Sequence, residues 1–131
     1  MNESIESRRL KLQDALDSRK SQRERNKLGQ FATPTALARE ILSFSLDLLP
    51  ENAPVHFLDP AIGTGSFYSA LVATAKPDRI ASARGFEIDG HYGRPASELW
   101  TGTPLSLTLA DFTTARPDGE WANLVICNPP Y

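Results

Sequence analysis

The chain has a single cysteine and no long apolar run, and both absences restrict what it can be. Cys127 has no second cysteine with which to form an internal disulfide, and it is interpreted as a small buried strand residue. No apolar run approaches the ~20 residues that a membrane helix needs. The polar, charged segment 1–12 is unlike a secretory signal. We therefore expect a cytoplasmic protein without a membrane segment.

Positive charge is scarce in most of the chain and concentrated near its amino terminus. Residues 1–40 hold nine Lys and Arg against six Asp and Glu, whereas residues 41–131 hold five against ten. The acidic part argues against a large phosphate-binding face. The basic segment predicts a helix over residues 4–28, exposed on most sides because Ile5, Leu12 and Leu16 form only a thin stripe. It would lie along nucleic acid or simply present a solvated face.

A second helix is predicted to run from Thr33-Pro34 to about Leu49. Thr33 would be its N-cap and Pro34 its first residue, while Gly29 would end the preceding helix. Phe31 is interpreted locally as a hydrophobic staple for this helix, with a ligand wall as the alternative. An apolar face for packing on a sheet is formed by Leu37, Ile41, Phe44 and Leu48.

A glycine-containing loop follows the first predicted strand, which covers residues 55–58. The loop reads Asp59-Pro60-Ala61-Ile62-Gly63-Thr64-Gly65, and a helix is predicted from about Ser66 to Ala75. Strand, glycine turn and helix form a nucleotide-binding arrangement. No lysine follows the glycines, and Tyr68 replaces the third glycine or alanine of a dinucleotide fingerprint. Because Asp59 would repel phosphate, the loop favours a cationic ligand that carries a nucleoside.

Three later segments are predicted to be strands, and each leads into a polar side chain. Residues 84–89 contain Glu87, which is placed to bind both hydroxyls of a ribose. Residues 105–110 lead into Asp111-Phe112, a pair that suits an adenine amino group and ring. Residues 122–127 lead into 128–131 (Asn-Pro-Pro-Tyr), where the prolines stop the ladder. We expect all four strand ends to meet at one edge of a parallel sheet and form a site there.

The stretch between the second and third predicted strands is less regular. Residues 90–104 contain three glycines and two prolines, so we expect an irregular segment with a short helix over residues 95–100. His91 and Tyr92 carry no specific signal and are interpreted as surface residues.

Five motifs in this order resemble the S-adenosylmethionine-dependent DNA adenine-N6 methyltransferases of the gamma class, the TaqI-like and PstI-like modification enzymes. The resemblance covers residues 29–131, with Ile62 as a departure in the loop. The matching motifs are Phe31-Ala32-Thr33-Pro34, the loop from Asp59 to Phe67, Glu87-Ile88-Asp89, Asp111-Phe112 and Asn128-Pro129-Pro130-Tyr131.

The resemblance implies an α/β fold, the Rossmann-like class I methyltransferase sheet, of which only the first four parallel strands are present, in the order 3-2-1-4. Residues 1–28 would be an amino-terminal helical extension, and residues 29–131 the amino-terminal half of the methyltransferase domain. A recognition domain for double-stranded DNA would follow, so this piece alone would be inactive. The fourth strand would be an exposed edge, prone to pair with another chain.

By the same resemblance the cofactor is S-adenosylmethionine, with no metal. Its methionine part would be held by the glycine-containing loop, and its adenine by Ile88 together with Asp111 and Phe112. Glu87 would take the ribose. The implied cofactor-binding residues are Phe31, Thr33, Asp59, Pro60, Ala61, Gly63, Gly65, Glu87, Ile88, Asp111 and Phe112.

The implied catalytic residues are Asn128, Pro129, Pro130 and Tyr131. Asn128 and the Pro129 carbonyl would accept hydrogen bonds from the amine of a flipped-out adenine, and Tyr131 would stack on its ring. A cognate restriction endonuclease is a possible partner. Two alternatives remain open: a methyltransferase for protein glutamine or RNA guanine, and a non-catalytic domain that binds nucleic acid or a protein partner.

Overall fold

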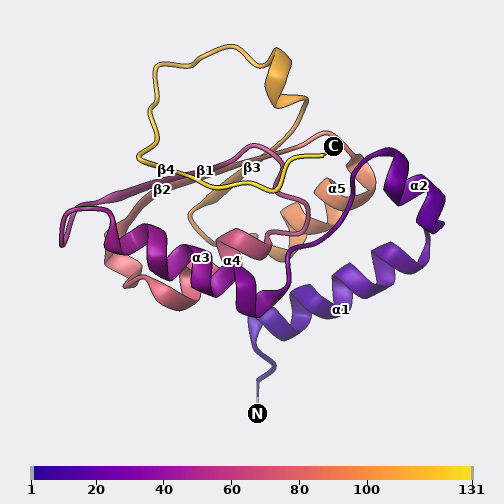
Figure 1. Cartoon of the computed structure of the whole chain (residues 1–131), viewed down its shortest axis with the longest axis horizontal. Helices are drawn as coiled ribbons and strands as arrows, with labels where there is room; N and C mark the ends of the chain where they lie inside the picture. Colours follow the sequence, from indigo (N-terminus) through magenta and orange to yellow (C-terminus); the bar gives the residue numbers. More distant parts are fainter. Residues whose placement is uncertain (1, 131) are drawn as a thin grey trace.

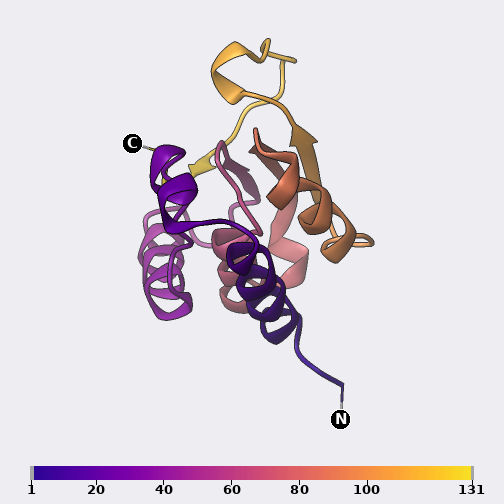
Figure 2. The same ribbon diagram turned by 90° about the vertical axis from the view of Figure 1, so that its right-hand side faces the viewer.

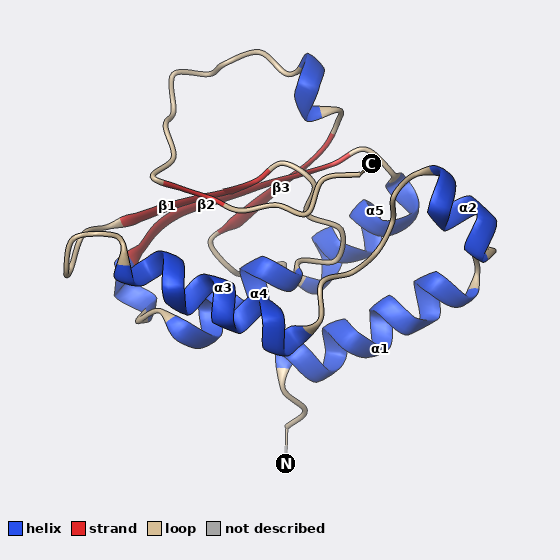
Figure 3. Ribbon diagram, in the orientation of Figure 1, coloured by secondary structure: helices blue, strands red, loops and turns tan. Residues whose placement is uncertain are grey.

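Four parallel strands form the sheet of this protein, in the order β3-β2-β1-β4. The computed structural model describes residues 2–130. The strands are β1 (Val55–Asp59), β2 (Ile80–Glu87), β3 (Leu105–Leu109) and β4 (Leu124–Val125), as seen in Figures 1 and 3. The predicted strand order is therefore confirmed. Because the strands are parallel, their carboxyl ends all reach the same edge of the sheet.

The helices lie on one side of the sheet, and the loop from β3 to β4 rises on the other side (Figures 1 and 2). The α-helices are α1 (Ile5–Ser18), α2 (Gln22–Lys27), α3 (Thr35–Asp47), α4 (Ser66–Thr74) and α5 (Gly90–Leu99). Short 3₁₀ turns cover Pro77–Arg79 and Phe112–Thr114. Within residues 2–130, no helix combines the length and apolar character needed to cross a membrane.

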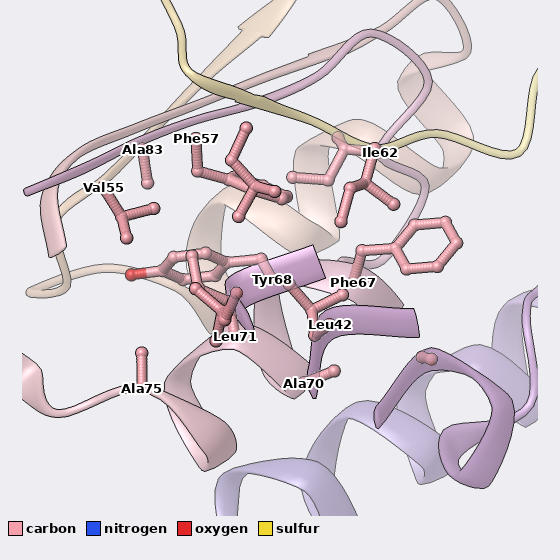
Figure 4. Packing of buried hydrophobic residues seen from close by; sticks show 14 of the residues in the cluster. Leu42, Val55, Phe57, Ile62, Phe67, Tyr68, Ala70, Leu71, Ala75 and Ala83 are labelled. Carbon is pink, nitrogen blue, oxygen red and sulfur yellow. The ribbon is translucent and has the colours of Figure 1, made fainter. Parts of the chain in front are cut away.

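The main core lies between the sheet and helices α3 and α4 (Figure 4). Val55 and Phe57 of β1 point down from the sheet, and Tyr68 and Leu71 of α4 pack beneath them. Leu42 of α3 closes the cluster, and all of these side chains are buried. This packing holds α4 under β1, so that the loop between them opens at the carboxyl edge of the sheet.

The apolar face predicted for α3 is wrong. Phe44 and Leu48 are 67% and 69% exposed, and Leu37 is also exposed. The buried residues are Ala38, Leu42 and Leu46, a second stripe on the same helix. Both stripes have helical spacing, and the stripe that contains Ala38 is the one that belongs to the core, where α3 lies against α4. Helical spacing alone therefore cannot decide which stripe is buried.

The single helix predicted over residues 4–28 is two helices, and the first is not largely exposed. Ser21 begins α2 with a capping box: its hydroxyl accepts from the Glu24 N–H at 3.1 Å, and its N–H donates to the Glu24 carboxylate at 3.0 Å. In α1, Arg9, Gln13 and Leu16 are buried. The spacing of apolar residues does not reveal this buried face of α1, because two of its three residues are polar.

The predictions for the start of α3, for residues 90–104 and for Tyr92 need correction, whereas the prediction for Gly29 is confirmed. Pro34, not Thr33, occupies the N-cap of α3, so Thr33 lies just outside the helix, where it is buried. Residues 90–99 form α5 despite Pro95, with Asp89 as N-cap, and Tyr92 is buried rather than at the surface. Gly29 ends α2 with a φ of 61°, as predicted.

The two stripes of α3 predict opposite responses to truncation. Leu42→Ala should lower the free energy of unfolding by about 2–5 kcal/mol, because it leaves a cavity between α3 and the sheet. Leu48→Ala, on the exposed stripe, should change it by less than about 0.5 kcal/mol. Urea denaturation of both variants measures the difference, and the reverse ranking would contradict the packing described here.

Candidate ligand-binding site at the carboxyl edge of the sheet

A cavity of about 670 Å³ lies where the carboxyl ends of the strands meet the segment between α2 and α3. Its size is typical of small-molecule sites. It brings together segments that are far apart in the sequence. The predicted site residues that line it are Phe31, Thr33, Asp59, Pro60, Ala61, Gly63, Glu87, Ile88, Asp111, Phe112, Asn128, Pro129 and Pro130.

Gly65 is the predicted site residue that does not line the cavity. It has a φ of 97°, and a Cβ placed there would lie 2.6 Å from Nε1 of Trp100. The turn and the packing of Trp100 therefore require glycine at this position. Gly63 differs, because its Cβ position is open. Tyr131 lies outside the described residues.

Asp59 ends β1 at the floor of the cavity and is only 1% exposed. Its Oδ1 accepts a hydrogen bond from the Ala61 N–H at 3.0 Å. Burial raises the pKa of Asp59 from 3.8 to about 7; the Ala61 N–H opposes this shift, and the nearby Glu87 carboxylate adds to it. Within residues 2–130, no Lys, Arg or His side chain forms an ion pair with Asp59. A buried carboxylate without a cation favours a positively charged ligand.

Glu87 joins the end of β2 to the glycine-containing loop. Its Oε1 accepts from the Gly63 N–H at 3.0 Å, and its Oε2 accepts from the Asp89 N–H at 2.8 Å. Burial raises the pKa of this carboxyl, although both hydrogen bonds act against the shift. Each carboxylate oxygen can accept a further hydrogen bond, so Glu87 keeps acceptor capacity for the hydroxyls of a ligand.

The other two strand ends contribute a carboxylate and an amide. Asp111 caps the turn after β3, where its Oδ1 accepts from Thr113 N at 2.9 Å. Asn128 Nδ2 donates to the backbone carbonyl of Phe31 at 3.2 Å, which leaves Oδ1 available to a ligand. This bond joins the segment after β4 to the segment before α3.

Exposed apolar side chains surround the polar groups of the cavity. Phe31, Ile88 and Phe112 line it from three separate segments, and all three are exposed. Phe112 is held edge-on against Phe86, with the ring centroids 5.2 Å apart. A flat aromatic ligand would cover these surfaces. The position of Phe31 supports the ligand-wall interpretation over the staple.

Several lining residues were not identified from the sequence. Gln13, Gln30 and Tyr92 lie on segments interpreted as solvated or irregular, and Lys27 is the one cationic side chain that lines the cavity in the described part of the chain. Cys127 is half-buried and lines the cavity, and burial, with Asp59 nearby, raises the pKa of its thiol. The sequence feature that places Cys127 near the cavity is its position directly before Asn128.

Within residues 2–130, no group of three or more His, Cys, Asp or Glu side chains is arranged to hold a metal ion.

The raised pKa of Asp59 predicts that the ligand-free protein loses stability as the pH rises. Between pH 4 and 7 the folded protein keeps a proton that the unfolded chain releases, so ionisation opposes folding. From pH 5 to pH 8 the free energy of unfolding should fall by roughly 2 kcal/mol. The low pKa values of Glu6 and Asp89, both about 2, act only in more acidic solution.

Urea denaturation at the two pH values measures this loss of stability. Asp59→Asn should remove most of the dependence, whereas Asp78→Asn, on an exposed turn, should leave it unchanged. Equal stability of the unsubstituted protein at both pH values would contradict the burial of an unpaired carboxylate.

Comparison with known proteins adds information on the fold. No model of a protein family matches the sequence. A proposed class I S-adenosylmethionine-dependent methyltransferase from Listeria monocytogenes has a TM-score of 0.74 and 22% identity, over 98% of this chain and 40% of that one. A proposed RNA methyltransferase from Pyrococcus horikoshii has a TM-score of 0.63 and 21% identity, over 79% of this chain and 50% of that one.

The plantazolicin methyltransferase, solved with S-adenosylhomocysteine, has a TM-score of 0.52 and 13% identity, over 92% of this chain and 40% of that one. The chain thus spans half or less of the length of each of these structures. At these identities the likeness shows the fold alone. The strand order and the helices match that fold, so the described residues have the Rossmann-like class I methyltransferase fold.

Proposed function

We propose that this chain binds S-adenosylmethionine and belongs to an enzyme that methylates N6 of adenine in double-stranded DNA. The observation that carries the proposal is the buried, unpaired Asp59 in a cavity that Gly63 and Asn128 also line. Asp59 suits the positive charge of the cofactor, and Asn128 suits an amine substrate. Class I methyltransferases among the compared structures support the cofactor assignment.

The cofactor would lie across the strand ends in an extended pose. Asp59 and the loop backbone at Ala61 and Gly63 would hold its methionine part, because a buried carboxylate attracts an ammonium or sulfonium group. Glu87 would accept hydrogen bonds from the ribose hydroxyls. Ile88 and Phe112 would cover the adenine ring, while Asp111 would accept from its amino group. When bound, S-adenosylmethionine supplies an electrophilic methyl group.

The chemistry assigned to the chain itself is orientation of the substrate amine. The lone pair of an exocyclic adenine amine is delocalised into the ring, so the amine is a poor nucleophile. Asn128 Oδ1 and the Pro129 carbonyl would accept its two hydrogens and draw the nitrogen toward tetrahedral geometry, freeing the lone pair. Pro130 would keep the backbone in the turn. Much of the rate would come from in-line positioning of amine and methyl group.

The substrate adenine would have to leave the duplex to reach this wall. Flipping a base out costs a few kcal/mol, and stacking on Tyr131 would return about 1–3 kcal/mol. The recognition of duplex DNA is assigned to a region outside these 131 residues, and a cognate restriction endonuclease is the proposed protein partner.

A second candidate function is methylation of RNA guanine. It is favoured by the fold similarity to the proposed RNA methyltransferase from Pyrococcus horikoshii. The two candidate functions share the cofactor and the role of the Asn128 amide, and they differ in the base that binds beside it. The contact between Asn128 and Phe31 fits the adenine enzymes better, because it uses the Phe-x-Thr-Pro segment of their motif set.

Cofactor binding is expected to depend on Asp59. Asp59→Asn should weaken S-adenosylhomocysteine binding at pH 7.5 at least tenfold, because the amide cannot neutralise the ligand's ammonium group. Isothermal titration calorimetry measures this loss, with Asp78→Asn as the matched control. Binding to the unsubstituted protein should strengthen from pH 5.5 to 8, as Asp59 ionises near pH 7. Undiminished binding by Asp59→Asn would remove the main support for this cofactor.

The assigned chemistry is tested in the full-length protein. Asn128→Ala should reduce transfer of labelled methyl groups to adenine-containing duplexes at least 100-fold, while S-adenosylhomocysteine affinity stays within threefold. Asn26→Ala, on exposed α2, is the matched control and should transfer normally. Full activity of Asn128→Ala would refute the mechanism, and transfer to RNA guanine in place of duplex adenine would select the second candidate.

A further inference from the structure

Helix α1 buries a polar face, which is unusual for an amino-terminal basic segment. Arg9 is 1% exposed and is the largest fully buried side chain among the described residues. Charged side chains are almost never fully buried unless they are paired. Figure 1 shows α1 running beneath α4 and α5. The buried face therefore points at the elements that carry the cavity.

Arg9 is bonded directly to the glycine-containing loop. Its Nη1 donates to Thr64 Oγ1 and to Ser66 Oγ, both at 3.0 Å. Thr64 Oγ1 in turn donates to Gln13 Oε1 at 2.6 Å. Thr64 stands between two glycines with φ values of 58° and 97°. Because glycines permit many backbone conformations, these side-chain bonds select the one in which the loop faces the cavity.

Glu6 satisfies the charge of Arg9 and extends the contact to two other helices. Its carboxylate accepts from Arg9 Nε at 2.8 Å and Nη2 at 2.7 Å, and also from Ser69 of α4 and from Thr35 of α3. Burial would raise the pKa of Glu6, but hydrogen bonds from Arg9, Ser69 and Thr35 lower it to about 2. The pair is therefore ionised and fully bonded, the condition under which a buried ion pair is tolerated.

A second anchor ties the same segment to the end of β2. Lys20 and Gln30 both donate to Asp89 Oδ2, and Lys20 Nζ also donates to Gln30 Oε1 at 2.8 Å. Asp89 lies two residues after Glu87 and donates its N–H to the Glu87 carboxylate. Nearby, the Tyr92 hydroxyl donates to Asp17 at 2.7 Å. The acid expected to bind ribose is thus held in place partly through Lys20, in the link between α1 and α2, and through Gln30, which follows α2.

Several of the basic side chains in residues 1–28 pair with acidic side chains of the same chain. Four of its eight Lys and Arg form ion pairs with carboxylates of this chain: Arg9, Lys11, Lys20 and Arg25. Gln13 and Lys27 line the cavity from this segment. The charge excess that suggested a nucleic-acid arm is thus partly neutralised within the fold.

We propose that α1 and the link that follows it, residues 19–21, form a clamp on the ligand site, in which Arg9 is a positioning residue for the loop at 63–66 and Lys20 positions the strand end at Asp89. Naming S-adenosylmethionine as the ligand rests on the proposed function. The positioning itself is a property of the ligand-free protein and does not depend on that assignment.

The experiment compares hydrogen exchange and ligand binding in the full chain. Arg9→Lys keeps the charge opposite Glu6 but cannot reach Thr64 and Ser66 at the same time. Amide exchange of residues 63–66 should become at least tenfold faster, while residues 82–85 in β2 stay unchanged. S-adenosylhomocysteine affinity should fall at least tenfold. Lys20→Met should accelerate exchange at residues 88–91 and weaken binding about threefold to tenfold.

Two controls separate positioning from general stability. Lys11→Met changes an exposed cation of α1 and should alter neither the amide exchange of residues 63–66 nor the S-adenosylhomocysteine affinity. Leu46→Ala destabilises the core of α3 without touching the loop, so it should lower the free energy of unfolding but preserve local exchange and affinity. Loss of affinity by Leu46→Ala equal to that of Arg9→Lys would reduce Arg9 to a structural role and overturn the proposal.

The outcomes also separate this inference from the proposed function. If the unsubstituted protein binds no S-adenosylhomocysteine, the proposed function fails, and exchange at residues 63–66 still decides whether Arg9 positions the loop. Faster exchange in Arg9→Lys upholds the clamp. Exchange and affinity within twofold of the unsubstituted protein refute it, even if the cofactor binds.

Discussion

The buried ion pair between Arg9 and Glu6 is the contact on which the arrangement of this protein depends. It lies where α1, α3, α4 and the glycine-containing loop converge, and its hydrogen bonds reach Thr35, Thr64, Ser66 and Ser69. Removing one member of a buried pair leaves an uncompensated charge, which typically costs about 3–5 kcal/mol. The loop that opens into the cavity is therefore positioned by a segment more than fifty residues earlier in the chain.

Four carboxylates near the cavity fall into two groups: those that are bonded to cations and stabilise the fold, and those that lack a cation and line the cavity. Glu6 and Asp89 are bonded to cations and other donors, which lower the pKa of each to about 2 despite partial burial. Asp59 is buried and Glu87 is half-buried, both accept hydrogen bonds only from backbone donors, and burial raises both pKa values. Paired acids hold the scaffold together, whereas unpaired acids retain electrostatic attraction for a ligand. Perturbed acids in a cavity are a common property of functional sites.

Residues predicted from the sequence surround the cavity because parallel topology follows from local patterns. Once four strands are identified, their carboxyl ends must share an edge, so Asp59, Glu87, Asp111 and Asn128 are brought together without knowledge of side-chain packing. Their exact roles remain predictions. The packing of Trp100 against Gly65 could not be predicted in this way, because the two residues are distant in the sequence.

The sequence by itself determined which segments are strands and which polar residues stand at their ends, because alternation, prolines and glycines act locally along the chain, whereas the strand order was implied by the resemblance to a known family. Only the tertiary structure decided which stripe of α3 is buried, that residues 90–99 are helical, and that α1 turns Arg9 inward. Each of these involves a partner distant in the sequence: α4 against α3, Leu109 beside Gly93, and Thr64 beside Arg9. A buried arginine has no apolar signature, so its partners alone reveal its place in the fold.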